Sequence, residues 1–290
     1  MHKHAIRICT LAALLLTPGV LFALEVAEAT NTHIPEAQQY HAGAVAHRGF
    51  NTRAPENTYA AGQMCIDTGV EYVEIDVRRT KDGVHVVLHD STVDRTTDGS
   101  GAIRDMTWAQ VKKLDAGSWY GEEFKGQRIP RVDEYLAWAK GRIKVYLDVK
   151  DADVEHLLKL VDNAGMREQV FAWSGSRSTM SQMRQLASWL PIKVNVKTAD
   201  EVRKAKSWGA AIVEYRADVE DMDALIEACE STGIIPMAYI TNDNREDFEI
   251  VIRHGAKLVN LNHPDVFFEV LSQIQQDHQP IATEPTETEG

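Results

Sequence analysis

Short runs of mostly β-branched residues alternate along the chain with amphipathic segments, and several of these segments end in glycine. The runs that we predict as strands are Ala44–His47, Tyr72–Arg79, Val84–His89, Ile143–Val149, Val170–Trp173, Ile192–Val196, Ala211–Tyr215, Ile234–Tyr239 and Lys257–Leu261. Glycine accepts the left-handed backbone that closes a helix. Glycines of this kind stand just before a strand at Gly69, Gly165, Gly209, Gly233 and Gly255. The order strand, helix, glycine, strand is typical of a parallel α/β fold.

The number of strands distinguishes between the parallel α/β folds. Tyr72–Arg79 and Val84–His89 are separated only by residues 80–83, which is too short for a parallel crossover and favours a hairpin. Without that antiparallel arm the remaining strands number eight, as in a (β/α)₈ TIM barrel. We therefore expect a distorted TIM barrel, and a doubly wound open sheet is the alternative.

Residues 90–141 do not follow the alternation of strand and helix. This stretch is longer than an ordinary loop and contains two segments of helical pattern, Thr107–Leu114 and Val132–Lys140. We interpret about residues 91–141 as a small insertion after the third strand, within one barrel domain of residues 30–278. Catalytic groups of such barrels lie at the carboxyl ends of the strands, where an insertion can shape the substrate site.

The two ends of the chain differ from the barrel segment. Residues 1–29 have the pattern of an export signal, with Lys3 and Arg7 before an apolar stretch and cleavage expected after Ala23 or Ala29. We expect a periplasmic or secreted protein with no stable membrane span after signal removal; an uncleaved anchor is the alternative. Residues 279–290 are rich in Pro, Thr and Glu and predict a flexible tail.

Composition restricts the partners of the chain. Its 290 residues carry a net charge of −12, which argues against a nucleic acid but not against a small anionic substrate in a locally positive pocket. Removal of the signal leaves two cysteines, Cys65 and Cys229, in a compartment that permits disulfides. The sequence leaves open whether they pair.

Acidic side chains gather where predicted strands end. Glu74 and Asp76 are two residues apart and therefore share one face of their strand. In a barrel mouth they would meet Asp148, and three carboxylates repel one another unless a cation lies between them. Ligand sets made only of oxygen favour Mg²⁺ or Ca²⁺ over zinc, so we expect one divalent cation.

Basic side chains accompany the carboxylates. His47 and Arg48 end the first strand, His89 ends the hairpin arm, and Lys150 stands two residues after Asp148. Together they favour a metal-assisted reaction on a phosphate, in which histidines act as general acid and base. Taken singly, each residue also fits a plainer role, such as a strand cap or an exposed ion pair.

The hairpin gives one geometric prediction. If Thr80 pairs with Gly83, His89 lies directly across from Glu74, with the two Cβ atoms about 5 Å apart. One histidine would then stand beside the metal site. Glu214, at the end of a later strand, is either functional or part of a buried ion pair.

Several motifs follow one another in a fixed order. They are His47-Arg48-Gly49, Pro55-Glu56-Asn57-Thr58, Glu74-x-Asp76, His89-Asp90, residues 94–101, residues 129–134 and Asp148-Val149-Lys150. This ordered set, within about residues 45–265, resembles the glycerophosphodiester phosphodiesterases. The resemblance implies a barrel with an insertion, and cleavage of a glycerophosphodiester to an alcohol and sn-glycerol 3-phosphate.

The resemblance also implies roles for single residues. It makes His47 and His89 the acid/base pair. It makes Glu74, Asp76 and Asp148 the metal ligands, places Arg48 and Lys150 on the phosphate, and gives Glu56 and Asn57 a supporting place. Three positions depart from the usual pattern of the family: Asp148 stands where glutamate is usual, Ile240 where an aromatic residue is common, and Asn262 where aspartate is frequent.

We therefore expect an exported, metal-dependent phosphodiesterase acting on a small-molecule glycerophosphodiester such as glycerophosphocholine. Two alternatives keep the same site: a lysophospholipase D, and a phosphoinositide-type enzyme that stops at a cyclic product. A third is a catalytically inactive barrel that serves as a surface binding protein.

Overall fold

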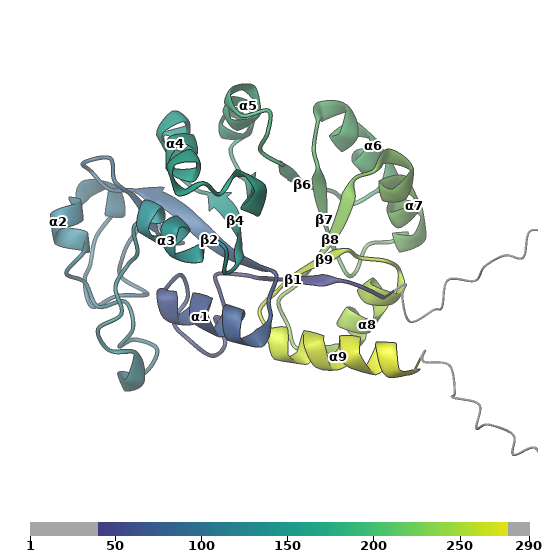
Figure 1. Cartoon of the computed structure of the whole chain (residues 1–290), viewed down its shortest axis with the longest axis horizontal. Helices are drawn as coiled ribbons and strands as arrows, with labels where there is room; N and C mark the ends of the chain where they lie inside the picture. The colour runs from purple at the N-terminus through teal and green to yellow at the C-terminus, as the bar shows by residue number, and fades with distance from the viewer. Residues whose placement is uncertain (1–39, 278–290) are drawn as a thin grey trace, which may run out of the picture. The chain divides into compact units, whose positions relative to one another are not determined.

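Eight parallel strands and one antiparallel arm form the sheet of this protein (Figure 1). The structure is a computed structural model that describes residues 40–277. The expected export signal and C-terminal tail therefore lie outside the described residues. The parallel strands are β1 (Gly43–Ala46), β2 (Tyr72–Arg79), β4 (Lys144–Val149), β5 (Val170–Trp173), β6 (Lys193–Asn195), β7 (Ile212–Arg216), β8 (Ile235–Ile240) and β9 (Leu258–Leu261).

The order of the strands closes the sheet almost completely. It runs β5-β4-β2-β1-β9-β8-β7-β6, and its two end strands meet at a single bridge between Ala172 and Ile192. The expectation of a distorted TIM barrel is confirmed, and the open doubly wound sheet is excluded. The distortion lies at the β5–β6 junction, where one bridge replaces a regular ladder.

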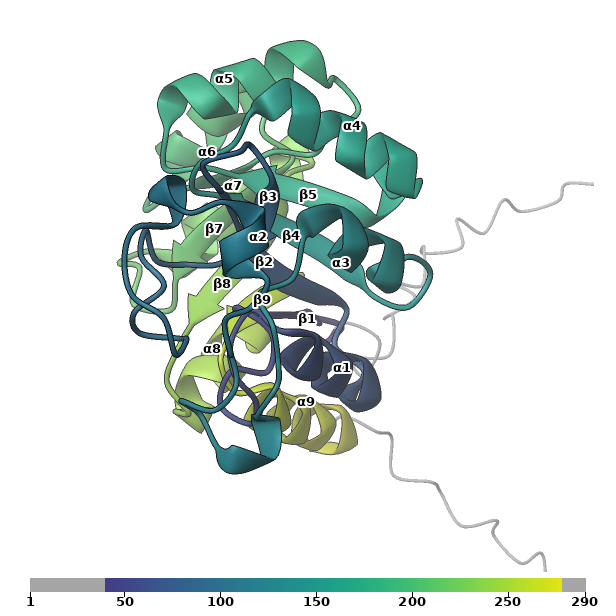
Figure 2. The same cartoon turned by 90° about the vertical axis from the view of Figure 1, so that its left-hand side faces the viewer.

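Helices surround the strands on the outside (Figures 1 and 2). They are α1 (Tyr59–Thr68), α3 (Val132–Ala139), α4 (Val154–Ala164), α5 (Arg177–Leu186), α6 (Ala199–Trp208), α7 (Met222–Thr232), α8 (Arg245–Arg253) and α9 (Pro264–Asp277). Four of the predicted glycines, Gly69, Gly165, Gly209 and Gly233, end helices at positive φ. The apolar faces of these helices pack on outward-facing strand residues in one large core.

The hairpin between β2 and β3 (His85–Val87) has a different register from the expected one. Val77 pairs with Val87 and Arg79 with His85, and Thr80 N donates to the carbonyl of Val84. The loop therefore has three residues, with a turn closed by Gly83 N to Thr80 O and Gly83 at φ +84°. His89 is consequently not opposite Glu74, and that prediction is wrong by one residue.

The stretch between β3 and α3 forms the insertion. It contains η2 (Ile103–Asp105), α2 (Trp108–Val111) and η3 (Glu122–Phe124). It encloses a small core of its own with β3, which includes Val93, Ile103 and Val111. Helix α3 belongs instead to the barrel core. The insertion therefore packs as a separate layer beside the barrel (Figure 2).

Within the described residues, the structure answers two further questions, namely whether Cys65 and Cys229 pair and whether a helix could span a membrane. Cys65 and Cys229 are both buried and both unpaired. Within residues 40–277, every helix is too short or too polar to cross a lipid bilayer.

Candidate active site

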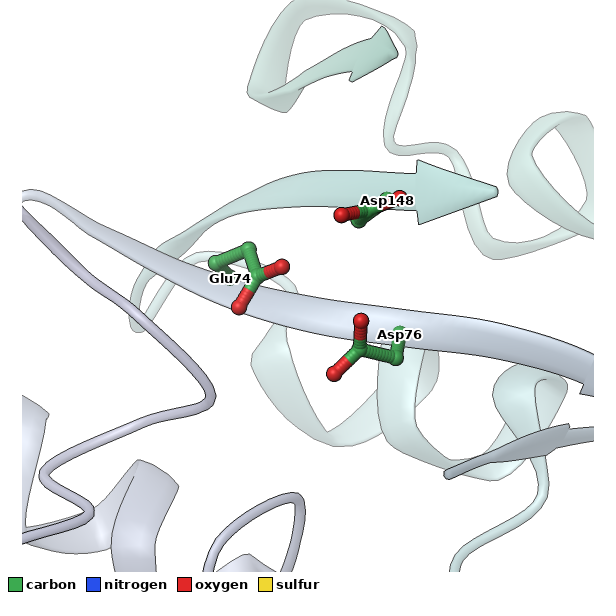
Figure 3. Close-up of side chains that lie close together, drawn as sticks. All are labelled: Glu74, Asp76 and Asp148. Carbon is green, nitrogen blue, oxygen red and sulfur yellow. The ribbon is translucent and has the colours of Figure 1, made fainter. Parts of the chain in front are cut away.

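Three acidic side chains meet inside the barrel (Figure 3). Glu74 and Asp76 alternate with the apolar residues of β2 and point inward, and Asp148 on the neighbouring strand β4 is the register partner of Asp76. One carboxylate oxygen of each residue lies within 4.8 Å of the other two. All three side chains are buried. The structure thus brings together the three carboxylates that the sequence singled out.

Burial and mutual repulsion disfavour the charged form of this cluster. Burial, followed by the charges of Asp76 and Asp148, raises the pKa of Glu74 well above its ordinary value. The pKa of Asp148 is raised to about 6, chiefly by burial and then by Asp76. Lys150 partly compensates, because its Nζ lies 2.7 Å from Asp148 and 3.2 Å from Asp76. Three carboxylates facing one ammonium leave an excess of negative charge.

The chemistry of the cluster fits a hard divalent cation. Asp148 Oδ1 is buried and accepts no hydrogen bond, whereas the buried Asp76 Oδ1 has only the Lys150 ammonium, 3.2 Å away, as a partner. Buried polar atoms normally have a partner, so the Asp148 oxygen is available to a ligand. The donor set is entirely oxygen, which favours Mg²⁺ or Ca²⁺.

Asp76 is held in place by the loop that follows β1. Asn57 Nδ2 donates to Asp76 Oδ2 at 2.7 Å, and Asp76 N donates to Asn57 Oδ1 at 3.2 Å. Both Asn57 and Arg48 adopt φ of +59°, a conformation that costs energy for a residue with a side chain. At Arg48 this conformation directs the backbone N–H at Glu74 Oε2, 2.5 Å away. The strained backbone therefore orients two of the three carboxylates.

His47 is fixed in one tautomer. Its Nδ1 lies 3.0 Å from Asn262 Oδ1, while Asn262 Nδ2 donates to the carbonyl of Thr241. Asn51 Nδ2 also donates to Asn262 Oδ1, so this atom is an acceptor and His47 Nδ1 carries the proton. Burial, with a smaller contribution from Arg48, lowers the pKa of His47. The imidazole is therefore neutral, with the lone pair on Nε2.

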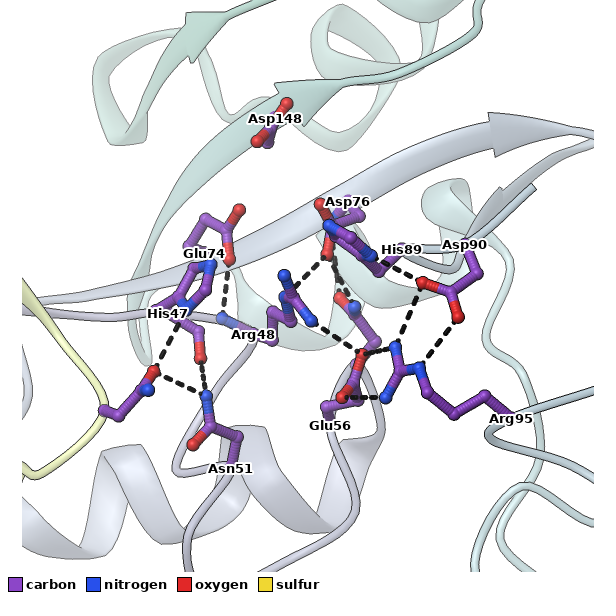
Figure 4. Close-up of polar contacts among 12 residues, drawn as sticks. His47, Arg48, Asn51, Glu56, Glu74, Asp76, His89, Asp90, Arg95 and Asp148 are labelled. Carbon is purple, nitrogen blue, oxygen red and sulfur yellow. Dashed lines mark hydrogen bonds and ion pairs between the residues drawn. The ribbon is translucent and has the colours of Figure 1, made fainter. Parts of the chain in front are cut away.

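A different partner orients His89 (Figure 4). Its Nδ1 lies 2.7 Å from Asp90 Oδ1. Arg95 from the insertion binds Asp90 through Nε and Nη2, and binds both oxygens of Glu56 at 2.7 and 2.8 Å. These hydrogen bonds, those from Arg95 first, lower the pKa of Asp90. His89 is thus paired with a carboxylate that stays ionised and that orients the imidazole ring.

The same network reaches the first strand. Glu56 Oε1 accepts from Arg48 Nη1 at 3.3 Å, and Arg48 Nε lies 3.8 Å from Asp76 Oδ2 without a hydrogen bond. The guanidinium therefore keeps a donor free beside the carboxylate cluster.

A cavity of about 1660 Å³ collects most of the predicted site residues. Those that line it are His47, Arg48, Glu74, His89, Asp148, Lys150 and Glu214. Asp76, Glu56 and Asn57 do not line this cavity, but Glu56 binds Arg48 and Asn57 binds Asp76. His89 reaches the cavity because pairing in the hairpin ends at Leu88, after which Arg78 Nε holds the carbonyl of His89.

Some residues of the site were not foreseen. Arg95, Asn51, Lys193 and Asn260 form hydrogen bonds with predicted site residues that lie 4 to 46 positions away in the sequence. Period-two alternation in β6 and β9 points Lys193 and Asn260 inward and is a signal that could have found them. Trp173 and Tyr239 also line the cavity, whereas Trp119 and Tyr120 pack together in the insertion.

Comparison with known proteins gives a consistent result. A protein named glycerophosphodiester phosphodiesterase from Caldanaerobacter subterraneus subsp. tengcongensis is 30% identical over 239 residues, covering 78% of this chain and 96% of that protein. A crystal structure of glycerophosphodiester phosphodiesterase from Agrobacterium tumefaciens shares 33% identity with a TM-score of 0.74, covering 78% of this chain and 98% of that chain.

A third similarity concerns the fold. A phosphodiesterase from Oleispira antarctica, solved in complex with the product sn-glycerol-3-phosphate, is 23% identical with a TM-score of 0.73. It covers 81% of this chain and 99% of that chain. The model of the glycerophosphoryl diester phosphodiesterase family matches residues 47–266, which include the whole site described above. The chain belongs to the glycerophosphoryl diester phosphodiesterase family.

Proposed function

We propose that this enzyme is exported and hydrolyses glycerophosphodiesters to an alcohol and sn-glycerol 3-phosphate with the help of one divalent cation. One observation carries the proposal. Asp148, with a buried carboxylate oxygen that has no partner, stands with Glu74 in one cavity that also holds two histidines and two basic side chains, and Asp76 completes the acidic cluster. The sn-glycerol-3-phosphate held by the Oleispira antarctica relative supports the substrate class.

Glu74, Asp76 and Asp148 would hold the cation, which we expect to be Ca²⁺ or Mg²⁺. When bound, such an ion polarises a phosphoryl oxygen as a Lewis acid. Arg48, with its free Nε, and Lys150, whose ammonium faces the cavity, would neutralise the phosphate. The usual glutamate is replaced by Asp148, whose side chain is one methylene shorter.

We assign the proton transfers from the two hydrogen-bonding environments. His47 has a free Nε2 and would accept the proton of the glycerol hydroxyl next to the phosphate, whose oxygen attacks phosphorus. His89, whose Nδ1 is paired with Asp90, would donate a proton to the alcohol oxygen as its bond to phosphorus breaks. Water would then open the cyclic phosphate with the two roles reversed, giving sn-glycerol 3-phosphate and restoring both histidines.

The test is a product assay on the purified chain. We expect release of sn-glycerol 3-phosphate from a panel of glycerophosphodiesters, loss of release in excess chelator, and recovery with Ca²⁺ or Mg²⁺. Full activity in the chelator would overturn metal dependence, and release from none of the substrates would overturn the activity itself.

Export has a separate test. The full chain and a chain lacking residues 1–29 are expressed, and the enzyme is measured in the cytoplasmic and external fractions. We expect only the full chain outside the cytoplasm, at a mass reduced by cleavage after Ala23 or Ala29. Retention of the full chain in the cytoplasm would contradict the export proposal.

A further inference from the structure

A second polar cluster lines the same cavity on strands β6, β7 and β9. Its members are Lys193, Glu214 and Asn260, and we refer to them as the polar wall. All three side chains are buried, with Lys193 only 2% exposed. None of them belongs to the motifs that carried the family resemblance.

The ammonium of Lys193 has both hydrogen-bond acceptors and aromatic rings as partners. Its Nζ donates to Glu214 Oε1 and to Asn195 Oδ1, both at 2.8 Å. The ammonium also lies 4.4 Å from the ring centroid of Trp173 and 5.5 Å from that of Tyr146. Both rings line the cavity. Lys193 therefore lies against both rings, with the Lys150 ammonium also 5.9 Å from the Trp173 centroid, and neutralises Glu214, the carboxylate of the polar wall.

Asn260 presents an acceptor that has no partner. Its Nδ2 donates to Glu214 Oε2 at 3.0 Å, and its Oδ1 is buried without a hydrogen bond. Reversing the amide would place its oxygen against the carboxylate of Glu214, so the orientation is fixed. A buried acceptor left unpaired costs about 1–3 kcal/mol, which a donor on a bound molecule would recover.

The barrel gains no evident stability from this cluster. A buried ion pair often contributes less than well-packed apolar residues of similar volume. The pair and the unpaired amide oxygen line the substrate cavity, where apolar side chains would fill the space without any unsatisfied group. This placement indicates a role in binding.

The chemistry of the wall selects the ligand. A quaternary ammonium is bound by free aromatic faces and an uncompensated carboxylate, and Lys193 already occupies both. A cation placed there would also be repelled by Lys193. A neutral hydroxyl, in contrast, can donate to Asn260 Oδ1 and pack on the ring edges. The wall thus fits an uncharged group that carries hydroxyls.

The cavity identifies which part of the substrate reaches the wall. Beyond the catalytic groups, its lining residues run along β6 and β7 to the first turns of α6 and α7, between Asn195 and Ala224. The large remaining space therefore lies on the side of the wall. The glycerol phosphate part is small and common to all substrates, so this space serves the variable head group.

We propose that the polar wall is a subsite for an uncharged polyol head group, such as glycerol or inositol, and that it discriminates against choline. This inference rests on the proposed function and reverses the sequence-based expectation of glycerophosphocholine as substrate. Lys193 acts by occupying the place that a cationic head group would take, and Asn260 by accepting a hydroxyl hydrogen bond.

The test compares kcat/KM for glycerophosphoglycerol, glycerophosphoinositol and glycerophosphocholine. The parent enzyme should prefer the two polyol esters. Lys193→Met frees the rings and the Glu214 carboxylate, and should shift the ratio toward the choline ester by about tenfold. Asn260→Leu should raise KM for the polyol esters by about tenfold and leave KM for the choline ester unchanged.

A second variant tests whether the shift in Lys193→Met comes from misfolding around an unpaired buried charge. Lys193→Met/Glu214→Gln removes both charges of the buried pair and should keep a smaller shift toward choline than Lys193→Met alone. The matched control is Lys144→Met. Lys144 pairs with Glu71 at 2.8 Å and lies 5.0 Å from the Tyr72 ring centroid, but it is not among the residues that line the cavity. In Lys144→Met, the ratio of kcat/KM for the choline ester to kcat/KM for the polyol esters should equal that of the parent.

Two failures can be told apart. If the parent releases sn-glycerol 3-phosphate from none of the three esters, the proposed function fails, and this inference with it. If the parent hydrolyses the esters but prefers choline, or if folded Lys193 variants keep the parent ratio, the polar wall proposal alone is overturned. The same holds if Asn260→Leu raises KM for all three esters equally, because the wall would then contact the shared glycerol.

Discussion

At the scale of single residues, the partner of His47 determines the pH at which this histidine can accept a proton. Asn262 is neutral, whereas an aspartate at its place would stabilise the imidazolium. Burial already lowers the pKa of His47. Asn262→Asp should therefore raise that pKa, so that the acidic limb of the profile of kcat/KM against pH moves upward by about one unit. An unmoved limb would contradict the role of His47 as base.

Removing either imidazole should abolish most of the turnover. His47→Ala and His89→Ala should each lower kcat by about 100- to 10,000-fold, the usual contribution of a positioned acid or base. The measurement is product release together with a thermal unfolding scan. His254→Ala is the control, because His254 contacts only the end of α8 and the nearby Asp223. Near-parent rates in a folded His47 or His89 variant would remove the acid/base assignment.

Arg95 acts on the reaction through other side chains. It binds both Glu56 and Asp90, which in turn contact Arg48 and His89. Arg95→Met should lower kcat by about ten- to a hundredfold with little change in KM, because Glu56 and Asp90 lose the contact that positions Arg48 and His89. The matched control is Arg131→Met, since Arg131 makes a similar two-point contact with Asp133 outside the cavity. An unchanged kcat in a folded Arg95→Met variant would reduce Arg95 to a structural role.

At the scale of elements, the sequence predicts strands well because two independent signals mark them. One is the run of β-branched residues, and the other is the glycine that ends the preceding helix. β2 and β5 have the predicted bounds, and the other parallel strands differ by one residue at one or both ends. The inward face of each strand follows from alternation, which is why Glu74, Asp76 and Asp148 could be placed together. Helix α5 ends at Leu186 with Ala187 as its C-cap, and so lacks the glycine that marks the end of other helices in the sequence.

Pairings that depend on turn geometry escaped prediction. The four residues 80–83 fit both a two-residue and a three-residue hairpin loop, and only the positive φ of Gly83 selects the second. Arg95 belongs to the motif of residues 94–101, but its contact with Glu56 spans 39 positions between two loops. Sequence patterns predict which face of a strand or helix points inward, whereas contacts between loops form only when the whole chain has folded.

The junction of β3 and α4 gives a prediction on stability. His85 is buried and accepts a hydrogen bond from Asp153 N at the start of α4. Burial, followed by His156 and Arg79, lowers the pKa of His85 from 6.5 to about 4. In this pH range His85 binds a proton in the unfolded chain but not in the folded chain. Stability is therefore lost as pH falls from about 6.5 to 4.

Thermal unfolding across this range tests the assignment. His85→Gln keeps an acceptor for Asp153 N but does not titrate, so its Tm should fall less between pH 6.5 and 4.5 than that of the parent. His41→Gln, at an exposed position, is the control and should follow the parent. Parallel curves for the parent and His85→Gln would show that His85 is not the group responsible.

At the scale of the whole molecule, the catalytic cluster works against the stability of the barrel that holds it. The pKa of Asp148 is raised from its ordinary 3.8 to about 6, so the folded chain without metal binds a proton that the unfolded chain has released. Between about pH 4 and 6 this contribution makes the metal-free protein less stable as pH rises. Glu74, with its pKa raised in the same direction, extends that loss to higher pH.

A bound cation should reverse this effect, because it binds the ionised carboxylates of the folded state and stabilises that state by mass action. We expect Ca²⁺ or Mg²⁺ to raise Tm more at pH 7.5 than at pH 5, where protons compete for the same oxygens. Taking the difference between scans with metal and with chelator removes the contribution of His85, which is the same in both. Asp148→Asn should reduce the metal-dependent rise in Tm, while Asp148→Glu should keep it. A rise in Tm that is equal at both pH values, or intact in Asp148→Asn, would mean that the ion binds elsewhere and that the three carboxylates do not share it.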